Sequence, residues 1–553
     1  MMISKCDLIT VIVLSLAFFL MATWALGKNS VPLSTWQSSG GEIFYVDLGS
    51  VKNVSEIYIL LKQGSISVAV YTGHPGNWDL KTTESFGDYY HWEGIRINNE
   101  TEFIRFVFSA SRAEIAEISA LDGDGRRIAI NVIKGENCDD NGLMTLVDEQ
   151  EKVECPPTYE SGTYFDEIYY VRTAEDYLNL REPYEWTHPP LGKLILAAGI
   201  YIFGYSPFGW RITGVLLATL MIPVIYVLGK KMFGTWIGAF APALLLMFDF
   251  MHFTMARIAT IDTFVVLFSL LSQLFFFTYI RNVLAQGWKT STRPLLLAVL
   301  FFSLGFSTKW YVLYGFLGQI FILLVLRLRE LSAFKGWIAR IRAFFSRPFF
   351  SFLVFLAIAM GIYLLTFVPY IIIGHTLADV YQAQWSMYNY HSTLTATHPF
   401  SSPWWTWPLI SRPVWLYVSD LPGGNVSTIA AMGNPAVWWI GLASVALAVE
   451  EGIRRKNHVC LFLVTMFLFQ WLPYALISRT LFLYHFYFDT PILILATAYL
   501  INKSWSTRRG KTIVLIYLVA VATLFVIFYP VISGMPTPYY WRDGLRWFRS
   551  WVF

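Results

Sequence analysis

From about residue 187 almost to its end, the chain is a succession of apolar stretches separated by clusters of basic residues. Only 14% of its 553 residues are charged, and its mean hydropathy is +0.50. Soluble domains carry about 25% charged residues, so this composition excludes a soluble enzyme, a coiled coil and a disordered tail. The net charge of +4 comes without a basic patch interleaved with aromatic residues, so nothing indicates nucleic acid as a partner. We predict an integral, multi-pass membrane protein.

A membrane-spanning helix needs about 20 apolar residues. The run from Asp7 to Gly27 has this length, which favours a retained first helix over a cleaved signal peptide. Ten more segments qualify: residues 211–231, 235–253, 260–280, 294–309, 310–327, 349–373, 435–451, 459–477, 484–501 and 512–530. The apolar stretch Leu191–Tyr205 is shorter, and we interpret it as an interfacial helix. The sequence therefore predicts a polytopic α-helical protein with about eleven transmembrane helices.

The basic residues support this count, because cytoplasmic loops are enriched in Lys and Arg. With Lys5 in the cytoplasm, every second connection should be basic. Those connections hold Lys230, Lys231, Arg281, Lys289, Arg293, the run from Arg327 to Arg347, Arg454, Arg455, Lys456, Lys503, Arg508, Arg509 and Lys511. The short connections on the other side carry one cation each: Arg257, Lys309 and Arg479. We therefore expect a cytoplasmic N-terminus, with residues 28–210 and 374–434 on the extracytoplasmic side.

The domain organisation follows from this topology. We expect a first transmembrane helix (1–27), an extracytoplasmic β-sandwich domain (28–135), an outer loop with an Asp-Glu pair and the interfacial helix (136–210), transmembrane helices two to seven (211–373), a Trp-rich outer loop (374–434), and helices eight to eleven with an outer C-terminal tail (435–553).

The predicted β domain has short alternating apolar runs, such as EIFYVDLG and EFIRFVF, between turn residues. This pattern predicts an antiparallel sandwich, and its short motifs resemble discoidin-like, galactose-binding jelly rolls. Such a domain either binds sugars at its loop ends or serves as a scaffold that shapes the site. Cys138 and Cys155 flank a polar stretch on the outer side, where a disulfide can persist. A Cys138–Cys155 bridge and two free thiols remain equally open.

Five clusters of polar and aromatic residues lie at the outer ends of the predicted spans. They are Tyr164-Phe165-Asp166-Glu167; Thr187-His188-Pro189-Pro190-Leu191-Gly192-Lys193; the segment from Arg257 to Asp262; the loop from His398 to Pro408, with Trp404, Trp405 and Trp407, which continues to Arg412; and Arg479, Tyr484 and His485. These clusters also have ordinary structural interpretations. The Asp-Glu pair can be solvated, and the prolines after His188 can simply start a helix. The tryptophans can form an aromatic belt, and the single cations can reach the lipid headgroups.

Two observations favour a functional interpretation of these clusters. Arg257, Lys309 and Arg479 lie on the side that disfavours cations, near the carboxylates Asp166 and Asp262, which indicates an anionic ligand. The charged residues also collect at one interface and not at the bilayer midplane, where transporters place their sites. Placed at a helix start, the adjacent Asp166 and Glu167 carboxylates are expected to point into one cavity. Together these features describe a membrane-surface reaction on a lipid phosphate.

The order of these motifs resembles the protein O-mannosyltransferases, which are membrane glycosyltransferases of the C-type (GT-C) superfamily. The motifs are Phe-Asp-Glu, His-Pro-Pro-Leu-x-Lys, Ala-Arg-Ile-x-x-x-Asp, Lys309-Trp310, His-Pro-x-x-Ser-x-x-Trp-x-Trp-Pro and Arg-Thr-x-Phe-x-Tyr-His. The resemblance runs from about residue 160 to the C-terminus. Eukaryotic members carry a β-trefoil domain after the seventh span, where this chain has a short loop, so a prokaryotic or archaeal member fits better.

The resemblance implies inverting transfer of mannose from a polyprenyl (dolichyl) phosphate donor to Ser or Thr hydroxyls of exported proteins at the outer face. Asp166 is the expected base, and Glu167 orients the acceptor or an arginine, with Arg257 as its partner. The donor's phosphate and sugar are expected to contact His188, Lys193, Arg257, Asp262, Arg479, Tyr484 and His485, with Asp262 holding Arg257. His398, Trp404, Trp405, Trp407 and Arg412 are expected to form a wall facing sugar or acceptor.

No cofactor is required by this scheme, although Asp166, Glu167 and His188 are chemically able to hold a divalent metal. The expected partners are the lipid-linked donor, a protein acceptor, membrane lipids and a second subunit, since family members often pair. Two alternatives remain: a C-type transferase that moves another sugar to a lipid or glycan, and a polyprenyl-phosphate transporter.

Overall fold

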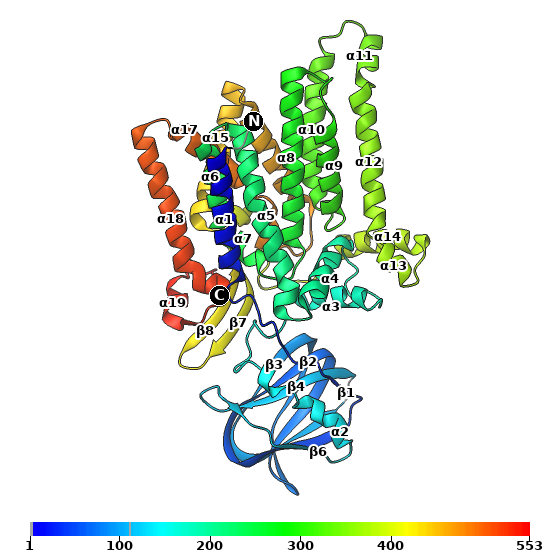
Figure 1. Ribbon diagram of the computed structural model, residues 1–553, viewed down its shortest axis with the longest axis vertical. Helices are drawn as coiled ribbons and strands as arrows, with labels where there is room; N and C mark the ends of the chain where they lie inside the picture. The colour runs from blue at the N-terminus through cyan, green and yellow to red at the C-terminus, as the bar shows by residue number, and fades with distance from the viewer. Residues whose placement is uncertain (1–3, 110–111) are drawn as a thin grey trace.

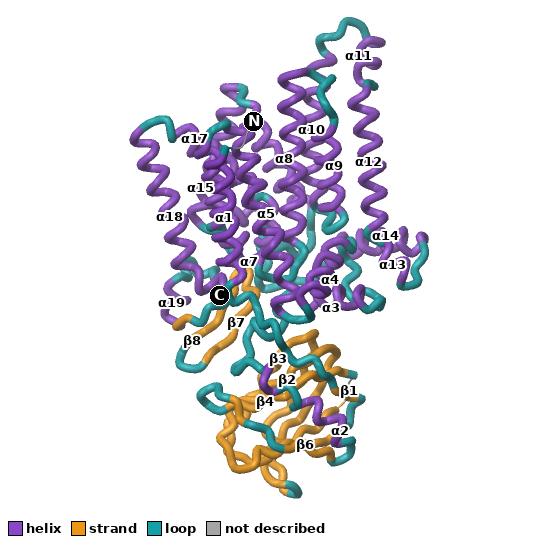
Figure 2. Tube along the Cα trace, in the orientation of Figure 1, coloured by secondary structure: helices purple, strands orange, loops and turns teal. Residues whose placement is uncertain are grey.

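The computed structural model describes residues 4–109 and 112–553. Figure 1 shows a bundle of long helices standing on a smaller β domain, which lies beyond one end of the bundle. Figure 2 shows that most strands belong to this β domain, while a separate hairpin, β7–β8, lies at the same end of the bundle.

The β domain contains β1 (Trp36–Ser38), β2 (Ile43–His74), β3 (Asn77–Ser109), β4 (Ala113–Leu121), β5 (Arg127–Ile128) and β6 (Val132–Gly135). All are antiparallel and form a six-stranded sheet in the order β1-β4-β2-β3, with β5 on β4 and β6 on β2. β2 pairs twice with the end of β3, since Phe106 lies opposite both Phe44 and Val70, so the sheet curls around its core. Phe44, Ile59, Val70 and Phe106 are buried in that core. The short helix α2 (Asp140–Leu143) follows.

The bundle is built from helices that are apolar over most of their surface. They are α1 (Lys5–Thr23), α5 (Pro207–Phe233), α6 (Trp236–Met247), α7 (Phe250–Ala256), α8 (Asp262–Gln286), α9 (Arg293–Phe306), α10 (Val312–Leu331), α11 (Trp337–Phe344), α12 (Arg347–Leu365), α15 (Pro435–Arg455), α16 (His458–Trp471), α17 (Thr490–Ser504) and α18 (Arg508–Ser533). Many carry exposed leucine, isoleucine or phenylalanine side chains, as lipid-facing helices do.

Among the described residues, eight helices are long and apolar enough to cross a membrane, or nine if the bent pair α6–α7 is one span. The other two of the eleven expected spans, α9 and α17, are too short to pass this test. Lys309 leaves the helix to reach Asp262, so α9 ends at Phe306, and residues 483–488 form a 3₁₀ turn that delays the start of α17 until Thr490. A helix of 14 residues, such as α9, reaches only about 21 Å at 1.5 Å per residue.

The end of the bundle next to the β domain holds most of the irregular structure. Its elements are α3 (Glu167–Leu178), α4 (Leu191–Phe203), α13 (Val368–Ile372), α14 (Leu377–Thr393), the 3₁₀ helix η3 (Trp404–Leu409), β7 (Val414–Leu421), β8 (Asn425–Ala431), β9 (Thr537–Pro538) and α19 (Tyr539–Gly544). The sheet order there is β7-β8-β9. The sequence pattern gave no indication of α14 or of this small sheet, because it showed only a long polar loop.

The β domain is fastened directly to the loop that precedes α3. The Thr163 amide donates to the Tyr90 carbonyl at 2.9 Å, and the Thr163 carbonyl lies 2.9 Å from Nδ1 of His91. The Lys62 ammonium forms an ion pair with Glu175 on α3 at 2.8 Å. These contacts fix the position of the residues just before Asp166.

Candidate active site

Asp166 caps the N-terminus of α3, but its carboxylate accepts no hydrogen bond from its own helix. No other described residue donates to it either, although the side chain is partly buried. Burial raises the pKa of Asp166 to about 7; Asp262 and Glu185 add to this effect, and the Lys309 ammonium opposes it. A carboxylate that is unpaired and has a pKa near neutrality is suited to accept a proton.

Glu167 lies in a different environment from its neighbour, which corrects the expectation that both carboxylates share one cavity. Its carboxylate is fully buried and accepts two hydrogen bonds of 2.7 Å from the Arg211 guanidinium. The Ala259 amide donates to it at 2.8 Å. The predicted pairing of Glu167 with Arg257 is therefore wrong. The start of α3 directs Glu167 into the core toward α5 and leaves Asp166 on the open side.

Arg211 was not predicted. Besides Glu167, it donates to the carbonyls of Leu26, Tyr159 and Gly162 at 2.8–3.0 Å. It therefore joins the end of α1, the loop before α3 and the start of α5. The positive-inside rule that singled out other outer cations also applies to Arg211, so a signal for it was present in the sequence.

Asp262 begins α8 and pairs with Lys309, not with Arg257 as expected. The Lys309 ammonium donates to both oxygens of Asp262, at 2.8 and 2.9 Å. Arg257 instead donates to four carbonyls, those of Ala22, Trp24, Ala25 and Ser533. Because α7 ends just before it, Arg257 reaches the ends of α1 and α18, where it holds backbone in place.

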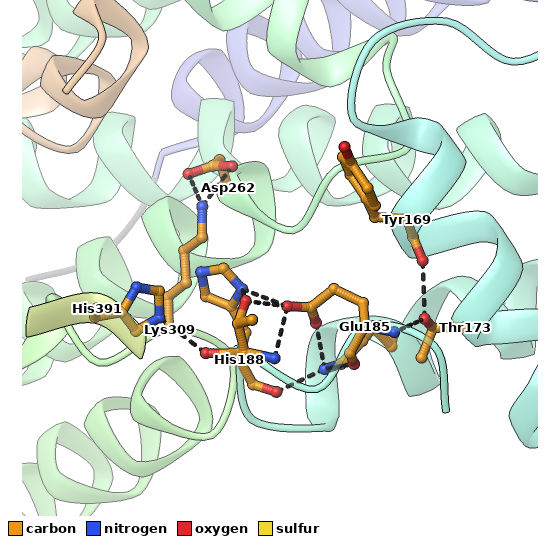
Figure 3. A network of polar contacts seen from close by, with 9 residues as sticks. Tyr169, Thr173, Glu185, His188, Asp262, Lys309 and His391 are labelled. Carbon is orange, nitrogen blue, oxygen red and sulfur yellow. Dashed lines mark hydrogen bonds and ion pairs between the residues drawn. The ribbon is translucent and has the colours of Figure 1, made fainter. Parts of the chain in front are cut away.

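Figure 3 shows a second polar network, in which Glu185 faces His188. The Glu185 carboxylate lies 2.9 Å from Nδ1 of His188 and accepts from the Lys193 ammonium at 2.6 Å. Lys193 also donates to the carbonyls of Glu185 and His188, so all its protons are used and it is 1% exposed. This geometry does not support the predicted contact between Lys193 and a phosphate.

The Lys193 and His188 contacts keep Glu185 ionised, because they hold the pKa of its carboxyl well below its usual range. Burial lowers the pKa of His188, although Glu185 opposes the shift. His391, at the end of α14, lies with its ring 5.0 Å from that of His188, and its Nε2 contacts the Thr187 carbonyl. Burial lowers the pKa of His391 to about 3, so both imidazoles are neutral at pH 7.

Arg479, Tyr484 and His485 lie together on the segment between α16 and α17, as predicted. The rings of Tyr484 and His485 stack at 4.8 Å, and Tyr484 meets the Phe165 ring edge-on at 6.1 Å. Arg479 is partly exposed and has no acceptor among the residues that the structure describes. It lies close enough to His391, Tyr484 and His485 to influence their titration, so it is an available cation beside the two networks.

The Trp-rich loop divides into buried and exposed parts. Trp407 is fully buried, stacks on His485 at 5.9 Å and supports it from behind. Trp404 packs edge-on against Trp471 at the bundle surface. Trp405 is 59% exposed, which fits an interfacial belt better than a wall of the site.

Of the other two residues in the predicted wall, His398 borders a cleft between the β domain and β7, together with Phe400. Arg412 is exposed and outside that cleft. The five residues of the predicted wall therefore do not form one surface: η3 directs its three tryptophans to different sides, and His398 and Arg412 lie outside η3.

Cys138 and Cys155 are both free thiols, which is one of the two alternatives that the sequence left open. Cys138 packs against the core of the β domain, whereas Cys155 packs where that domain meets α3 and α4. Among the described residues, two groups have metal-compatible spacing, Asp88-His91-Glu93 and Glu117-Asp148-Glu149, and neither includes Asp166, Glu167 or His188.

Sequence reasoning missed Glu185 and His391 as members of the site. Glu185 precedes His188 by three residues and Lys193 by eight, a spacing that is visible in the chain. His391 is far from both in sequence and reaches them only through the fold of α14. Taken together, the site offers an unpaired carboxylate, an available guanidinium, an ammonium held by Asp262, and neutral imidazoles. These groups suit proton abstraction from a hydroxyl beside an anionic leaving group.

Comparisons with known proteins agree on one family. Residues 187–350 match the family model for dolichyl-phosphate-mannose-protein mannosyltransferase. Residues 376–551 match the model for the C-terminal four-transmembrane region of protein O-mannosyltransferase. The chain is 26% identical over 460 residues to the polyprenol-phosphate-mannose–protein mannosyltransferase of Mycobacterium tuberculosis, covering 71% of this chain and 87% of that protein. The Corynebacterium glutamicum protein of the same name is 24% identical over 430 residues, or 66% of this chain and 81% of that protein.

A solved structure also resembles the fold. It is that of the Saccharomyces cerevisiae protein O-mannosyltransferase Pmt1-Pmt2 complex bound to the sugar donor, with a TM-score of 0.60 at 13% identity. The match covers 71% of this chain and 89% of that chain. The likeness concerns the fold alone, which is that of a polytopic, multi-pass membrane protein.

Proposed function

The chain belongs to the protein O-mannosyltransferase family, and from this premise we propose that it transfers mannose from a polyprenyl phosphate donor to Ser or Thr hydroxyls of exported proteins. The observation that carries the proposal is the partly buried Asp166, with which no described residue pairs, near the Lys309–Asp262 pair. Arg479 lies near the same site, since Tyr484 is within reach of the charges of both Asp166 and Arg479. Asp166 provides a proton acceptor, and Lys309 and Arg479 provide two cations.

In the proposed reaction, Asp166 accepts the proton of the acceptor hydroxyl while its oxygen attacks the anomeric carbon. The bond between that carbon and the phosphate oxygen breaks, the electron pair leaves with the polyprenyl phosphate, and the sugar configuration inverts. Arg479 and Lys309 stabilise the charge that develops on the phosphate. This assignment replaces Lys193 and Arg257, whose donors are already used by carboxylate and carbonyl oxygens.

The remaining residues of the site position these groups. Glu185 accepts from Nδ1 of His188, which leaves Nε2 of the neutral imidazole able to accept from a hydroxyl of the donor's sugar. Glu167 and Arg211 fix the start of α3 and thereby the direction of Asp166. Tyr484 and His485 form a stacked platform beside Phe165, where a sugar ring can pack. The scheme itself requires no metal.

We also propose an eleven-span topology, made of α1, α5, the bent α6–α7, α8, α9, α10, α12, α15, α16, α17 and α18. The basic segment at α11 and the N-terminus lie at the bundle end away from the β domain, which supports a cytoplasmic assignment for that end. The active site is then extracytoplasmic, and the curled β sheet is proposed as the discoidin-like sandwich. We keep the domain boundaries that the sequence predicts, and we propose that two subunits form a dimer.

The test is transfer of label from radiolabelled polyprenyl-phosphate mannose to a Ser/Thr-rich peptide by purified protein. Asp166→Asn should lower transfer about 10²–10⁴-fold, the usual contribution of a general base, while donor binding persists. Asp124→Asn, an exposed carboxylate of the β domain, is the matched control and should transfer normally. Normal transfer by Asp166→Asn would refute the assignment. Donor binding by wild type without transfer to peptide would favour another acceptor, such as a lipid or glycan.

A further inference from the structure

A cleft of about 550 Å³ separates the β domain from the β7–β8 hairpin. The β domain forms one wall of it with Tyr58, Trp92 and Arg96, and residues 415–420 of β7 form the other. Residues 162–165 of the loop before α3 form the floor. The volume lies within the range of ligand-binding clefts, about 300–1,000 Å³.

The strand that borders this cleft has a free edge. Within the described part of the chain, β7 pairs only with β8, so it is the edge strand of the order β7-β8-β9. Successive side chains of a strand point to opposite faces, yet every residue from 415 to 420 lines the cleft. β7 therefore turns its edge, with unpaired backbone N–H and C=O groups, toward the cleft.

The floor of the cleft leads to the proposed base. Phe165 lines the cleft, and its ring also contacts Tyr484 of the polar site. Asp166 is the next residue, and the left-handed backbone of Phe165, with φ near +52°, turns the chain between the two. A molecule that lies along β7 is therefore bound next to the groups that would act on it.

Unpaired strand edges bind extended polypeptides through backbone hydrogen bonds, while neighbouring pockets select side chains. We propose that this cleft binds the acceptor polypeptide as an added strand on the free edge of β7, and that the β domain selects its sequence. The proposal rests on the proposed function, since it names how the acceptor of that reaction is held.

The β-domain wall supplies chemistry for such selection. Tyr58 donates to Glu56 at 2.7 Å, and Arg96 lies 3.5 Å from the same carboxylate. The Arg96 side chain is 75% exposed, so it can contact a charged residue of the acceptor at little cost. Trp415 on the opposite wall meets Phe400 edge-on, which leaves an aromatic surface for apolar side chains.

The first test uses acceptor peptides that carry a single N-methyl group on one backbone amide at a time. In an added strand, alternate residues face the partner edge. We expect N-methylation at every second amide to lower kcat/KM for peptide about tenfold, from one lost hydrogen bond, and the intervening positions to be tolerated. A profile without this alternation would overturn strand addition.

The second test reverses a charge on the β-domain wall. Arg96→Glu should lower kcat/KM about three- to tenfold for a peptide with acidic flanks and raise it for one with basic flanks. The KM for the donor should not change. Lys52→Glu is the matched control, because Lys52 is exposed on β2 outside the cleft. Equal preferences in Arg96→Glu and wild type would overturn the selection by the β domain.

Failure of the cleft proposal is distinguishable from failure of the proposed function. If wild type transfers mannose to peptide but neither test gives the expected pattern, the acceptor is held elsewhere and the function stands. If wild type transfers to no peptide, while a glycan or lipid accepts the sugar, both proposals fail together.

Discussion

Substitution of Arg211 by methionine removes a fully buried guanidinium group that makes five hydrogen bonds. Methionine fills much of the space but leaves the Glu167 carboxylate buried without a cation. Three carbonyls at the junction of α1, the loop before α3 and α5 also lose their donor. The perturbation therefore acts on the support of Asp166 without touching Asp166 itself.

The size of the effect follows from the burial of the pair. Removing one partner of a buried ion pair costs about 3–5 kcal/mol, because the remaining charge is uncompensated. With an unfolding entropy of about 2.1 cal/mol/K per residue over 553 residues, this corresponds to a fall of about 3–4 °C in Tm. Transfer activity should fall further, because the start of α3 shifts and Asp166 with it.

The assay is thermal unfolding in detergent at one fixed scan rate, since such proteins often unfold irreversibly. Arg211→Met, Glu167→Gln and the double variant form a cycle that isolates the coupling of the two side chains. Arg508→Met, an exposed arginine at the far end of the bundle, is the control. The double variant should be less destabilised than the two single changes added together.

Two outcomes would refute the reasoning. If Arg211→Met unfolds at the wild-type temperature and transfers normally, the pair does not support the site. If the effects of Arg211→Met and Glu167→Gln simply add, the two side chains are not coupled and the destabilisation comes only from the lost carbonyl contacts.

The other predictions concern the charges of the site. Asp166 must be ionised to accept a proton, and its pKa of about 7 lies above that of a free aspartate, so kcat/KM should fall about tenfold per pH unit below about pH 6 and level off above about pH 8. A rate that stays constant down to pH 5 would contradict this. Arg479→Met should lower kcat/KM for the donor about 10–100-fold, the value of a charge-assisted hydrogen bond. The Tm of the protein without donor should not change. Arg508→Met should match wild type, and equal donor kinetics in both variants would exclude Arg479 from the phosphate site.

The sequence predicted a polytopic membrane protein because hydropathy and basic clusters are local properties of each segment. The long apolar helices, the β domain and the segments that carry the candidate site could be predicted for the same reason. Asp166, Asp262, Arg479 and His485 became candidates because they lie in clusters at the predicted outer ends of the spans, the side on which cations are disfavoured.

The partners of those residues were decided by the tertiary structure alone. Arg257 and Arg211 are both arginines at helix ends near the β domain, and nothing in the local sequence shows which of them is the partner of Glu167. The choice depends on which helix packs beside α3. Likewise, Asp262 meets Lys309 because α9 ends early, and His391 meets His188 because α14 folds back over the site. Hydropathy is a sum over neighbouring residues in the chain and can be calculated from the sequence. An ion pair forms only when the packing of distant helices brings two charged groups within about 3 Å of each other.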